Sequence, residues 1–236
     1  MIDGPDPDAL RGRHERLLLR LREVAAANGH DPDRLRIVGV TKTHPIETVR
    51  AAVAAGITRL GESRVQEAEP KVEAVREAEW HFIGRLQSNK ARRVVRAFAV
   101  IHSVDSVALL ERVDRIAAEE DRRPRVLLEV NVSGEASKAG LAPGELATAA
   151  APRAVPLVGL MTIAPMDADP DDARRHFRRL RELRDELEQR LGIGLPELSM
   201  GMSADAEAAA AEGATLVRIG TALFGPRHET LVSSTA

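Results

Sequence analysis

A lysine follows directly after a short apolar segment near the start of the chain. The segment covers residues 35–41, and Lys42 comes next; only four of the 34 basic residues are lysines. If the segment is a strand of an α/β barrel, Lys42 lies at its carboxyl end, where such barrels carry out their chemistry. A desolvated lysine there can attack an aldehyde, whereas an exposed loop lysine would not. Position alone allows both interpretations, and the scarcity of lysine favours the chemical one.

Two segments near the end of the chain have the composition of an anion site. Residues 199–203 read Ser-Met-Gly-Met-Ser, and residues 218–221 read Arg-Ile-Gly-Thr. Glycine lets the backbone approach an anion, and helix starts, hydroxyls and guanidinium groups donate to it. The alternative is a pair of glycine turns with a capping serine. An amine and an anion site together suggest a ligand with a carbonyl and a phosphate. The candidate contacts are Gly201, Met202, Ser203, Arg218, Gly220 and Thr221.

Two further positions are weaker candidates. Ser63 lies in the segment Gly61–Glu67, where it could equally cap the following helix. His81 alternates with apolar neighbours, a pattern more typical of a hydrogen-bonded core histidine than of a ligand. The histidines show no metal-binding spacing, and neither a P-loop nor a dinucleotide-binding glycine motif is present.

Composition excludes several classes of function. A net charge of -2 and an aromatic content of 2% make nucleic-acid binding improbable, because neither a basic field nor a stacking surface is available. There is no cysteine, so disulfides and thiolate chemistry are excluded. Neither a signal peptide nor a membrane-spanning apolar stretch is evident. We therefore expect a soluble cytoplasmic protein without membrane or nucleic-acid partners.

Short apolar runs alternate with helical segments along the chain. Eight runs are expected to form strands: 36–40, 59–61, 81–84, 97–102, 126–132, 157–162, 198–200 and 216–219. Helices are expected at 8–28, 46–55, 64–78, 88–96, 106–120, 144–151, 171–191 and 204–212. Continuously apolar strands alternating with helices indicate a parallel sheet covered by helices. Eight of them favour a single (β/α)8 TIM-type barrel, with an open sheet of six or seven strands as the competitor.

The expected domain organisation is simple. Residues 1–30 should form an extra N-terminal helix that packs on the barrel, residues 31–228 the barrel itself, and residues 229–236 a disordered tail. No linker, low-complexity stretch or internal repeat is apparent.

Several of these segments together resemble one family, the pyridoxal phosphate homeostasis proteins, which are barrels related to the N-terminal domain of alanine racemase. The resemblance spans residues 36–227 in the order of the family. Its most specific parts are Trp-His-Phe-Ile-Gly at 80–84 with Leu-Gln-Ser-Asn-Lys at 86–90, and Ser-Met-Gly-Met-Ser at 199–203. Other matches are Val-Thr-Lys-Thr-His-Pro at 40–45, residues 61–67, 131–133, 137–140 and 159–162, and Arg-Ile-Gly-Thr-Ala-Leu-Phe-Gly at 218–225.

The resemblance implies a cofactor and roles for the candidate residues. Lys42 would carry pyridoxal 5'-phosphate (PLP) as a Schiff base. The phosphate would be held by Ser203, Arg218, Gly220 and Thr221, with Gly201, Met202, Ser63 and His81 as further cofactor contacts. The family usually has Asn where this chain has Ser63, so an amide contact near the cofactor is shortened or lost. Arg85 also replaces a residue that is usually proline or small.

Binding PLP does not by itself establish catalysis. Alanine racemases use a tyrosine as the second proton-transfer group and related decarboxylases use a cysteine, and this chain has neither residue. The family resemblance favours a protein that buffers or carries PLP, with transient contact to apo PLP enzymes, and exists as a monomer or weak dimer. A weak amino-acid racemase or transaminase is the alternative. A Schiff-base aldolase without cofactor fits less well, because its lysine is expected on a late strand.

Overall fold

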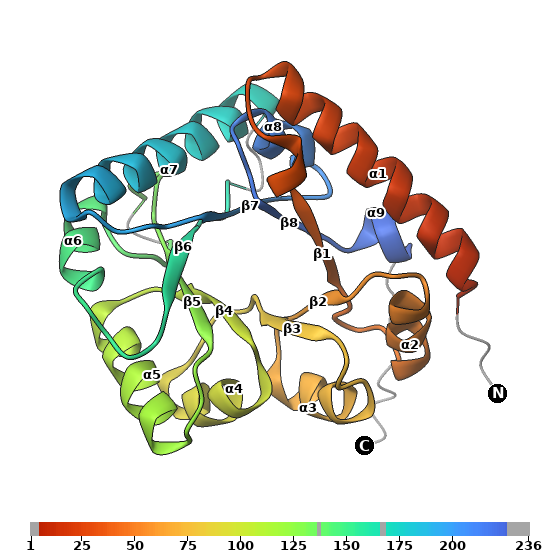
Figure 1. Cartoon of the computed structure of the whole chain (residues 1–236), viewed down its shortest axis with the longest axis horizontal. Coiled ribbons are helices and arrows are strands. Elements are labelled where there is room, and N and C mark those ends of the chain that lie inside the picture. Colours follow the sequence, from red (N-terminus) through yellow and green to blue (C-terminus); the bar gives the residue numbers. More distant parts are fainter. Residues whose placement is uncertain (1–4, 136–137, 166–168, 226–236) are drawn as a thin grey trace, which may run out of the picture.

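Eight parallel strands close into a barrel in the computed structural model, which describes residues 5–135, 138–165 and 169–225. Each strand pairs with the next one along the chain, and β8 pairs back with β1. Helices run around the outside of the strands (Figure 1). The predicted (β/α)8 TIM-type barrel is therefore confirmed. The open-sheet alternative is excluded, because an open sheet would leave two edge strands unpaired.

All eight predicted strands are present. The first and last have the predicted bounds, whereas the fourth was placed too early, because the helix before it continues to Ala97. The strands are β1 (Arg36–Val40), β2 (Arg59–Glu62), β3 (Glu79–Phe82), β4 (Val100–Val104), β5 (Arg125–Glu129), β6 (Leu157–Met161), β7 (Glu197–Met202) and β8 (Leu216–Ile219).

The helices follow the predicted order, with one addition at the end. The capping signals act as expected: the Ser106 hydroxyl caps α5, and the Asp169 carboxylate caps α7. The added helix, α9, is too short to leave a periodic apolar pattern. The α-helices in the described residues are α1 (Pro7–Ala27), α2 (Ile46–Ala54), α3 (Val65–Ala74), α4 (Ala91–Ala97), α5 (Val107–Glu119), α6 (Leu146–Ala149), α7 (Pro170–Leu191), α8 (Ala206–Ala211) and α9 (Thr221–Phe224).

Apolar side chains fill both faces of the strands. Successive residues of a strand point to opposite faces, so Leu127 faces the barrel interior while Leu128 faces the helices. The interior cluster is small, and it consists of Val38, Val100, Leu127, Met161 and Leu216 with Val158 against it. The layer between strands and helices is far larger, and it supplies most of the apolar burial of the fold.

Ion pairs, rather than apolar contacts, link the amino-terminal ends of the strands. Arg36 at the start of β1 pairs with Glu197 at the start of β7 at 2.6 Å. Arg59 and Arg125, which begin β2 and β5, both pair with Glu79 at the start of β3. One set of ion pairs thus joins β1 to β7, and a separate set joins β3 to β2 and β5.

The first helix, α1, lies along the outside of the barrel beside α8, and it also contacts α2 and α9 (Figure 1). It buries Leu10 and Leu21 completely, and Arg20 donates to both carboxylate oxygens of Glu207 at 3.1 and 3.2 Å. The tail expected at residues 229–236 lies outside the described residues.

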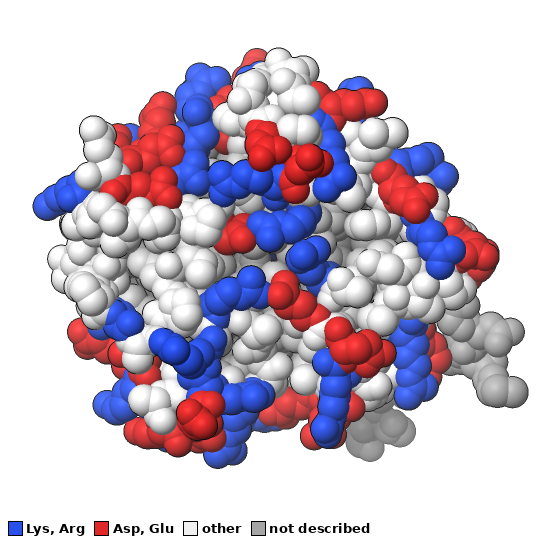
Figure 2. Space-filling model, viewed as in Figure 1, with Lys and Arg blue, Asp and Glu red and all other residues white. Residues whose placement is uncertain are grey.

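The surface mixes charges of both signs. On the face seen in Figure 2, acidic and basic side chains are interleaved, so the small net charge of -2 reflects cancellation rather than a lack of charged residues. Even α7, the longest helix in the described part of the chain, has no apolar stretch that would fit the thickness of a bilayer.

Gly159 on β6 provides a test of this strand packing. A Cβ atom at that position would lie 1.9 Å from the carbonyl oxygen of Glu197 on β7. Gly159→Ala should therefore lower the free energy of unfolding by about 1–3 kcal/mol or more, as measured by urea denaturation. The matched control is Gly144→Ala, because a Cβ there would meet no atom within 4 Å. Equal stability of the two variants would contradict the packing.

Candidate functional site

Three neighbouring strands bring the main candidate residues to one end of the barrel. Lys42 lies two residues beyond the end of β1, Ser203 directly beyond β7 and Gly220 directly beyond β8. Because the strands are parallel and β7, β8 and β1 are consecutive in the barrel, these segments are adjacent at the carboxyl end. A Cβ on Gly220 would lie 3.5 Å from the carbonyl oxygen of Val40. The Lys42 side chain is half-buried at this end of the barrel.

The segments after β7 and β8 contact each other. The Ser203 hydroxyl accepts a long hydrogen bond of 3.5 Å from the N–H of Ala222 in the only turn of α9. Gly220, which precedes α9, has no side chain to cap the first N–H groups of that helix. Thr221 begins the helix and is exposed. The structure thus brings Ser203, Gly220 and Thr221 together, and their contact with a phosphate stays a prediction.

Two glycines allow close backbone approach around this end of the barrel. Gly201 has a φ of +87°, and a Cβ there would lie 2.5 Å from the Cβ of Ala209. A Cβ at Gly84 would lie 2.1 Å from the carbonyl oxygen of Ser63, so glycine lets the loop after β3 pack on the loop after β2. Met202, which lies between Gly201 and Ser203 at the carboxyl end of the barrel (called the rim below), is exposed.

A buried lysine holds the turn that carries Lys42. Lys71 on α3 donates to the carbonyl oxygen of Thr41 at 2.9 Å, one residue before Lys42. On the other side, Thr43 has the unusual φ of +66° for a residue with a β-branched side chain. Its N–H donates to the carboxylate of Glu67 at 2.5 Å. The backbone is therefore fixed on both sides of Lys42 by groups from α3.

The same lysine neutralises two carboxylates. Lys71 Nζ lies 2.7 Å from Glu62 and 2.9 Å from Glu67, and the side chains of Lys71 and Glu62 are 5% and 0% exposed. Burial raises the pKa of Glu62, against the opposing effect of Lys71. One oxygen of Glu62, Oε2, is buried without a hydrogen-bond partner in the described residues. Burial also acts to raise the pKa of Glu67, but hydrogen bonds from Lys71 and Thr43 outweigh it and lower that pKa.

A chain of buried hydrogen bonds crosses the barrel interior beneath this end. Arg218 Nη1 lies 2.6 Å from Ser199 Oγ, which lies 2.8 Å from His102 Nδ1. His102 Nε2 lies 2.8 Å from His81 Nδ1, and His81 Nε2 lies 2.9 Å from Glu79. The chain therefore joins a guanidinium near the carboxyl end of the barrel to a carboxylate at its amino end.

One assignment of protons satisfies every group in the chain. Burial lowers the pKa of both His81 and His102, so both rings are neutral. Each ring then carries its proton on Nε2 and accepts on Nδ1, and all donors point from Arg218 toward Glu79. The pKa of Arg218 falls to about 10 through burial, so it remains a cation at neutral pH. Its second donor, Nη2, binds the carbonyl oxygen of Thr162 at 2.9 Å.

These positions modify two of the expectations from sequence. Arg218 is buried beneath the rim rather than exposed beside Ser203, and protein atoms already accept from both of its Nη nitrogens. His81 is buried with protein partners at both ring nitrogens, which favours the core-histidine interpretation over a cofactor contact. A cavity of about 250 Å³ lies beside Thr162, at the carboxyl ends of β5 and β6, and Lys138 is among its lining residues.

Comparison with known proteins shows the family of the chain. Residues 20–228 match the family model described as alanine racemase, N-terminal domain. A protein of Aquifex aeolicus named pyridoxal phosphate homeostasis protein is 43% identical over 222 residues, covering 91% of this chain and 97% of that protein. The chain belongs to the pyridoxal phosphate homeostasis protein family. A Pseudomonas aeruginosa protein of the same name is 46% identical over 220 residues, covering 88% of this chain and 91% of that protein.

Solved structures agree with membership of the pyridoxal phosphate homeostasis protein family. PipY of Synechococcus elongatus, solved with PLP bound, is 42% identical and superposes with a TM-score of 0.77, covering 87% of this chain and 100% of that one. A Bifidobacterium adolescentis protein is 36% identical with a TM-score of 0.85, covering 95% of this chain and 98% of that one. The family resemblance inferred from the motifs is confirmed.

Sequence reasoning missed the groups that support the site in this family member. In the sequence, Lys71 looks like an ordinary residue of a predicted helix. The only signal of a special role was that the chain contains just four lysines. His102 stood inside an apolar run, where neither its neighbours nor its spacing indicated a partner. Its contact with Ser199 joins residues 97 positions apart, which no local pattern can reveal.

Lys71→Met tests the support of the Lys42 turn. Without the ammonium, Glu62 would be a buried carboxylate without a counter-charge, so the variant should lose about 3–5 kcal/mol of stability. The pKa of Glu62, already raised in the folded state, should rise further, so the loss should be larger at about pH 8 than at about pH 5. Thermal or urea denaturation at the two pH values measures this. The double variant Lys71→Met/Glu62→Gln should recover part of the stability and lose the pH dependence; a pH-independent loss in the single variant would contradict the pairing.

Proposed function

We propose that this chain binds PLP through a Schiff base to Lys42 and acts as a PLP buffer or carrier without robust turnover. The observation that carries the proposal is the placement of a half-buried lysine beside Gly201 in the last turn of β7, Ser203 directly after β7 and Gly220 directly after β8. Support comes from relatives named pyridoxal phosphate homeostasis protein and from the PLP-bound structure of PipY.

The residues present fit such a cofactor. The Lys42 amine would condense with the aldehyde of PLP and release one water, and the cofactor would supply an electron-withdrawing ring. The backbone at Gly220 and the hydroxyls of Ser203 and Thr221, which the structure brings together, would receive the phosphate. Arg218 would contribute a fixed positive charge beneath the rim, since its pKa remains about 10 despite burial.

Storage rather than turnover follows from the proton-transfer groups of the chain. It contains neither tyrosine, the second proton-transfer group of alanine racemases, nor cysteine, which the related decarboxylases use. His81 and His102 are neutral and buried, and both nitrogens of each ring have protein partners. Neither histidine is therefore poised to exchange a proton with a substrate at the rim. The proposal includes that this protein is cytoplasmic, that it is a monomer or weak dimer, and that it transfers PLP to apo enzymes.

Lys42→Ala tests the attachment. The parent protein incubated with PLP should show the visible absorbance of a protonated Schiff base, and borohydride should fix the label on the peptide that contains Lys42. The Lys42→Ala variant should lose the band while retaining its far-UV circular dichroism. Lys90→Ala is the matched control, because it removes a half-buried lysine from the loop after β3. An unchanged band in Lys42→Ala would place the attachment elsewhere.

Arg218→Gln distinguishes two roles for the buried guanidinium. If Arg218 acts on the phosphate, as the sequence predicts, the variant should discriminate less than the parent between PLP and pyridoxal. Loss of a charge-assisted contact should cost the phosphorylated ligand about tenfold or more in affinity and leave pyridoxal nearly unaffected. Equilibrium dialysis of both ligands measures the ratio. Equal weakening of both ligands would instead show that Arg218 acts on the ring or only supports the fold.

A further inference from the structure

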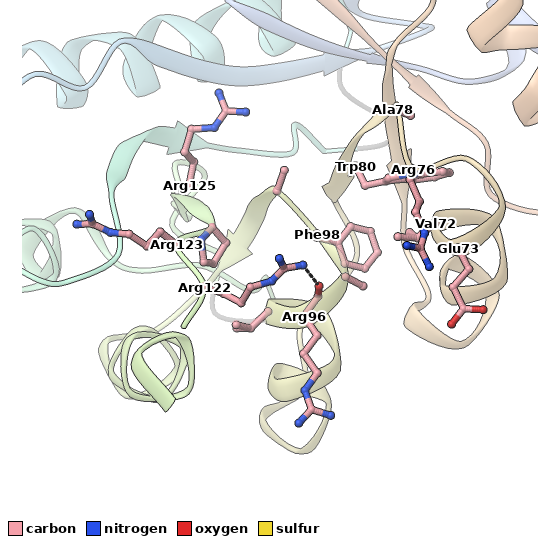
Figure 3. Close-up of a pocket in the computed structure, with 14 residues that line it drawn as sticks. Val72, Glu73, Arg76, Ala78, Trp80, Arg96, Phe98, Arg122, Arg123 and Arg125 are labelled. Carbon is pink, nitrogen blue, oxygen red and sulfur yellow. Dashed lines mark hydrogen bonds between the residues drawn. The ribbon is translucent and has the colours of Figure 1, made fainter. Parts of the chain in front are cut away.

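A second, larger cavity lies at the opposite end of the barrel from Lys42. It is bounded by the end of α3 and by the segments that lead into β3, β4 and β5, and its volume is about 720 Å³. That volume falls in the range of about 300–1,000 Å³ typical of small-molecule sites. Its lining residues precede or begin strands, whereas Lys42 follows one, so the cavity is separate from the candidate PLP site (Figure 3).

The charges around this cavity are strongly unbalanced. Five arginines and a single glutamate, Glu73, line it. Two of the arginines, Arg96 and Arg125, are paired with glutamates. Throughout the described ranges of the chain, no carboxylate lies within ion-pair distance of the other three, which are Arg76, Arg122 and Arg123. This concentration of positive charge on a protein with a net charge of -2 indicates an anionic ligand.

Two of the unpaired guanidinium groups, those of Arg122 and Arg76, lie on either side of the Phe98 ring in the view of Figure 3, whereas Arg123 points away from the ring. Arg122 is held by a hydrogen bond of 2.6 Å from Nη2 to the carbonyl oxygen of Arg96, and it has further donors to offer. The two groups come from different elements, the α3–β3 connection and the α5–β5 connection.

The inner wall between these arginines is apolar. Val72 and Ala97 are half-buried and Ala99 is exposed, whereas Trp80 and Phe98 are only 3% and 4% exposed. The two rings therefore back the wall, and the smaller side chains provide accessible apolar surface. The Trp80 indole N–H is already satisfied by the carbonyl oxygen of Val75 at 2.9 Å. An apolar wall with a cationic rim suits a ligand that joins an anion to a flat apolar group.

We propose that this cavity binds a small organic phosphate that carries a heterocyclic ring, as in a nucleoside monophosphate. A phosphate offers about two charges and three acceptor oxygens, which can serve both Arg76 and Arg122, while the ring lies against the apolar wall. A carboxylate has only one charge for two guanidinium groups. This site is independent of the proposed binding of PLP at Lys42.

The only tryptophan of the chain lines the cavity and provides the readout. The full-length protein, loaded with PLP and then freed of excess PLP by gel filtration, is titrated with adenosine 5'-monophosphate, adenosine and inorganic phosphate while Trp80 fluorescence is followed at an excitation wavelength where adenine does not absorb. The monophosphate should bind at least about tenfold more tightly than either fragment, because only it uses both the arginines and the wall. No saturable change with the monophosphate would overturn the proposal.

The variant Arg76→Gln/Arg122→Gln should weaken the monophosphate by about tenfold or more, since each change removes a charge-assisted contact. Arg16→Gln is the matched control, because it removes an exposed arginine of α1, which packs on the far side of the barrel from α3 to α5. The visible absorbance of the Schiff base should stay unchanged throughout the titration, which separates this site from the PLP site. Equal affinity of the parent and the double variant would place the ligand elsewhere, and tight binding of inorganic phosphate alone would exclude a role for the ring.

Discussion

The pairing of β8 with β1 is the constraint on which the proposed site depends. It aligns Gly39 with Ile219, and these residues are 180 positions apart in the chain. Gly220 is thereby placed against Val40, the last residue of β1, and Lys42 follows two residues later. In an open sheet with the same strand order, the first and last strands would lie at opposite edges, and Lys42 could not face the segments after β7 and β8. Barrel closure thus converts two separate sequence motifs into one site.

Closure alone does not orient the lysine. The turn around Lys42 is fixed by contacts to α3, where Lys71 binds the backbone before it and Glu67 binds the backbone after it. The positive φ of Thr43 is an unfavourable conformation for a β-branched residue, and it persists because these contacts determine it. A buried ion pair seldom adds net stability compared with apolar packing. Its presence here is better explained by the geometry that it imposes on the neighbouring backbone.

The sequence predicted the architecture and the rim more successfully than the interior. Strand number, order and approximate bounds followed from continuous apolar runs, because each run is a local property of the chain. Ser203 and Gly220 lie directly after β7 and β8, at the end of the barrel where the sequence placed them, and their contact with a phosphate stays a prediction. The position of Arg218 beneath the rim could not be predicted, because it depends on Ser199 and on the carbonyl oxygen of Thr162, which only the closed barrel brings near. The hydrogen bond between His81 and His102 could not be predicted either, because it depends on the register in which β3 and β4 pair.

Acid affects the two ends of the barrel in opposite ways. At the amino end, the hydrogen bond from His81 and then the charge of Arg125 lower the pKa of Glu79 to about 2. Its ion pairs therefore stabilise the fold above the ordinary pKa of glutamate, and that stabilisation disappears as the pH falls toward 2. At the carboxyl end, burial raises the pKa of Glu62, so its ionised form is the costly one and protonation relieves part of that cost. Mild acid should then weaken the hold of Lys71 on Glu62 while the ion pairs of Glu79 persist. Of the two carboxylates that Lys71 binds, Glu62 is thus the more sensitive to acid, because its pKa is raised whereas the pKa of Glu67 is lowered.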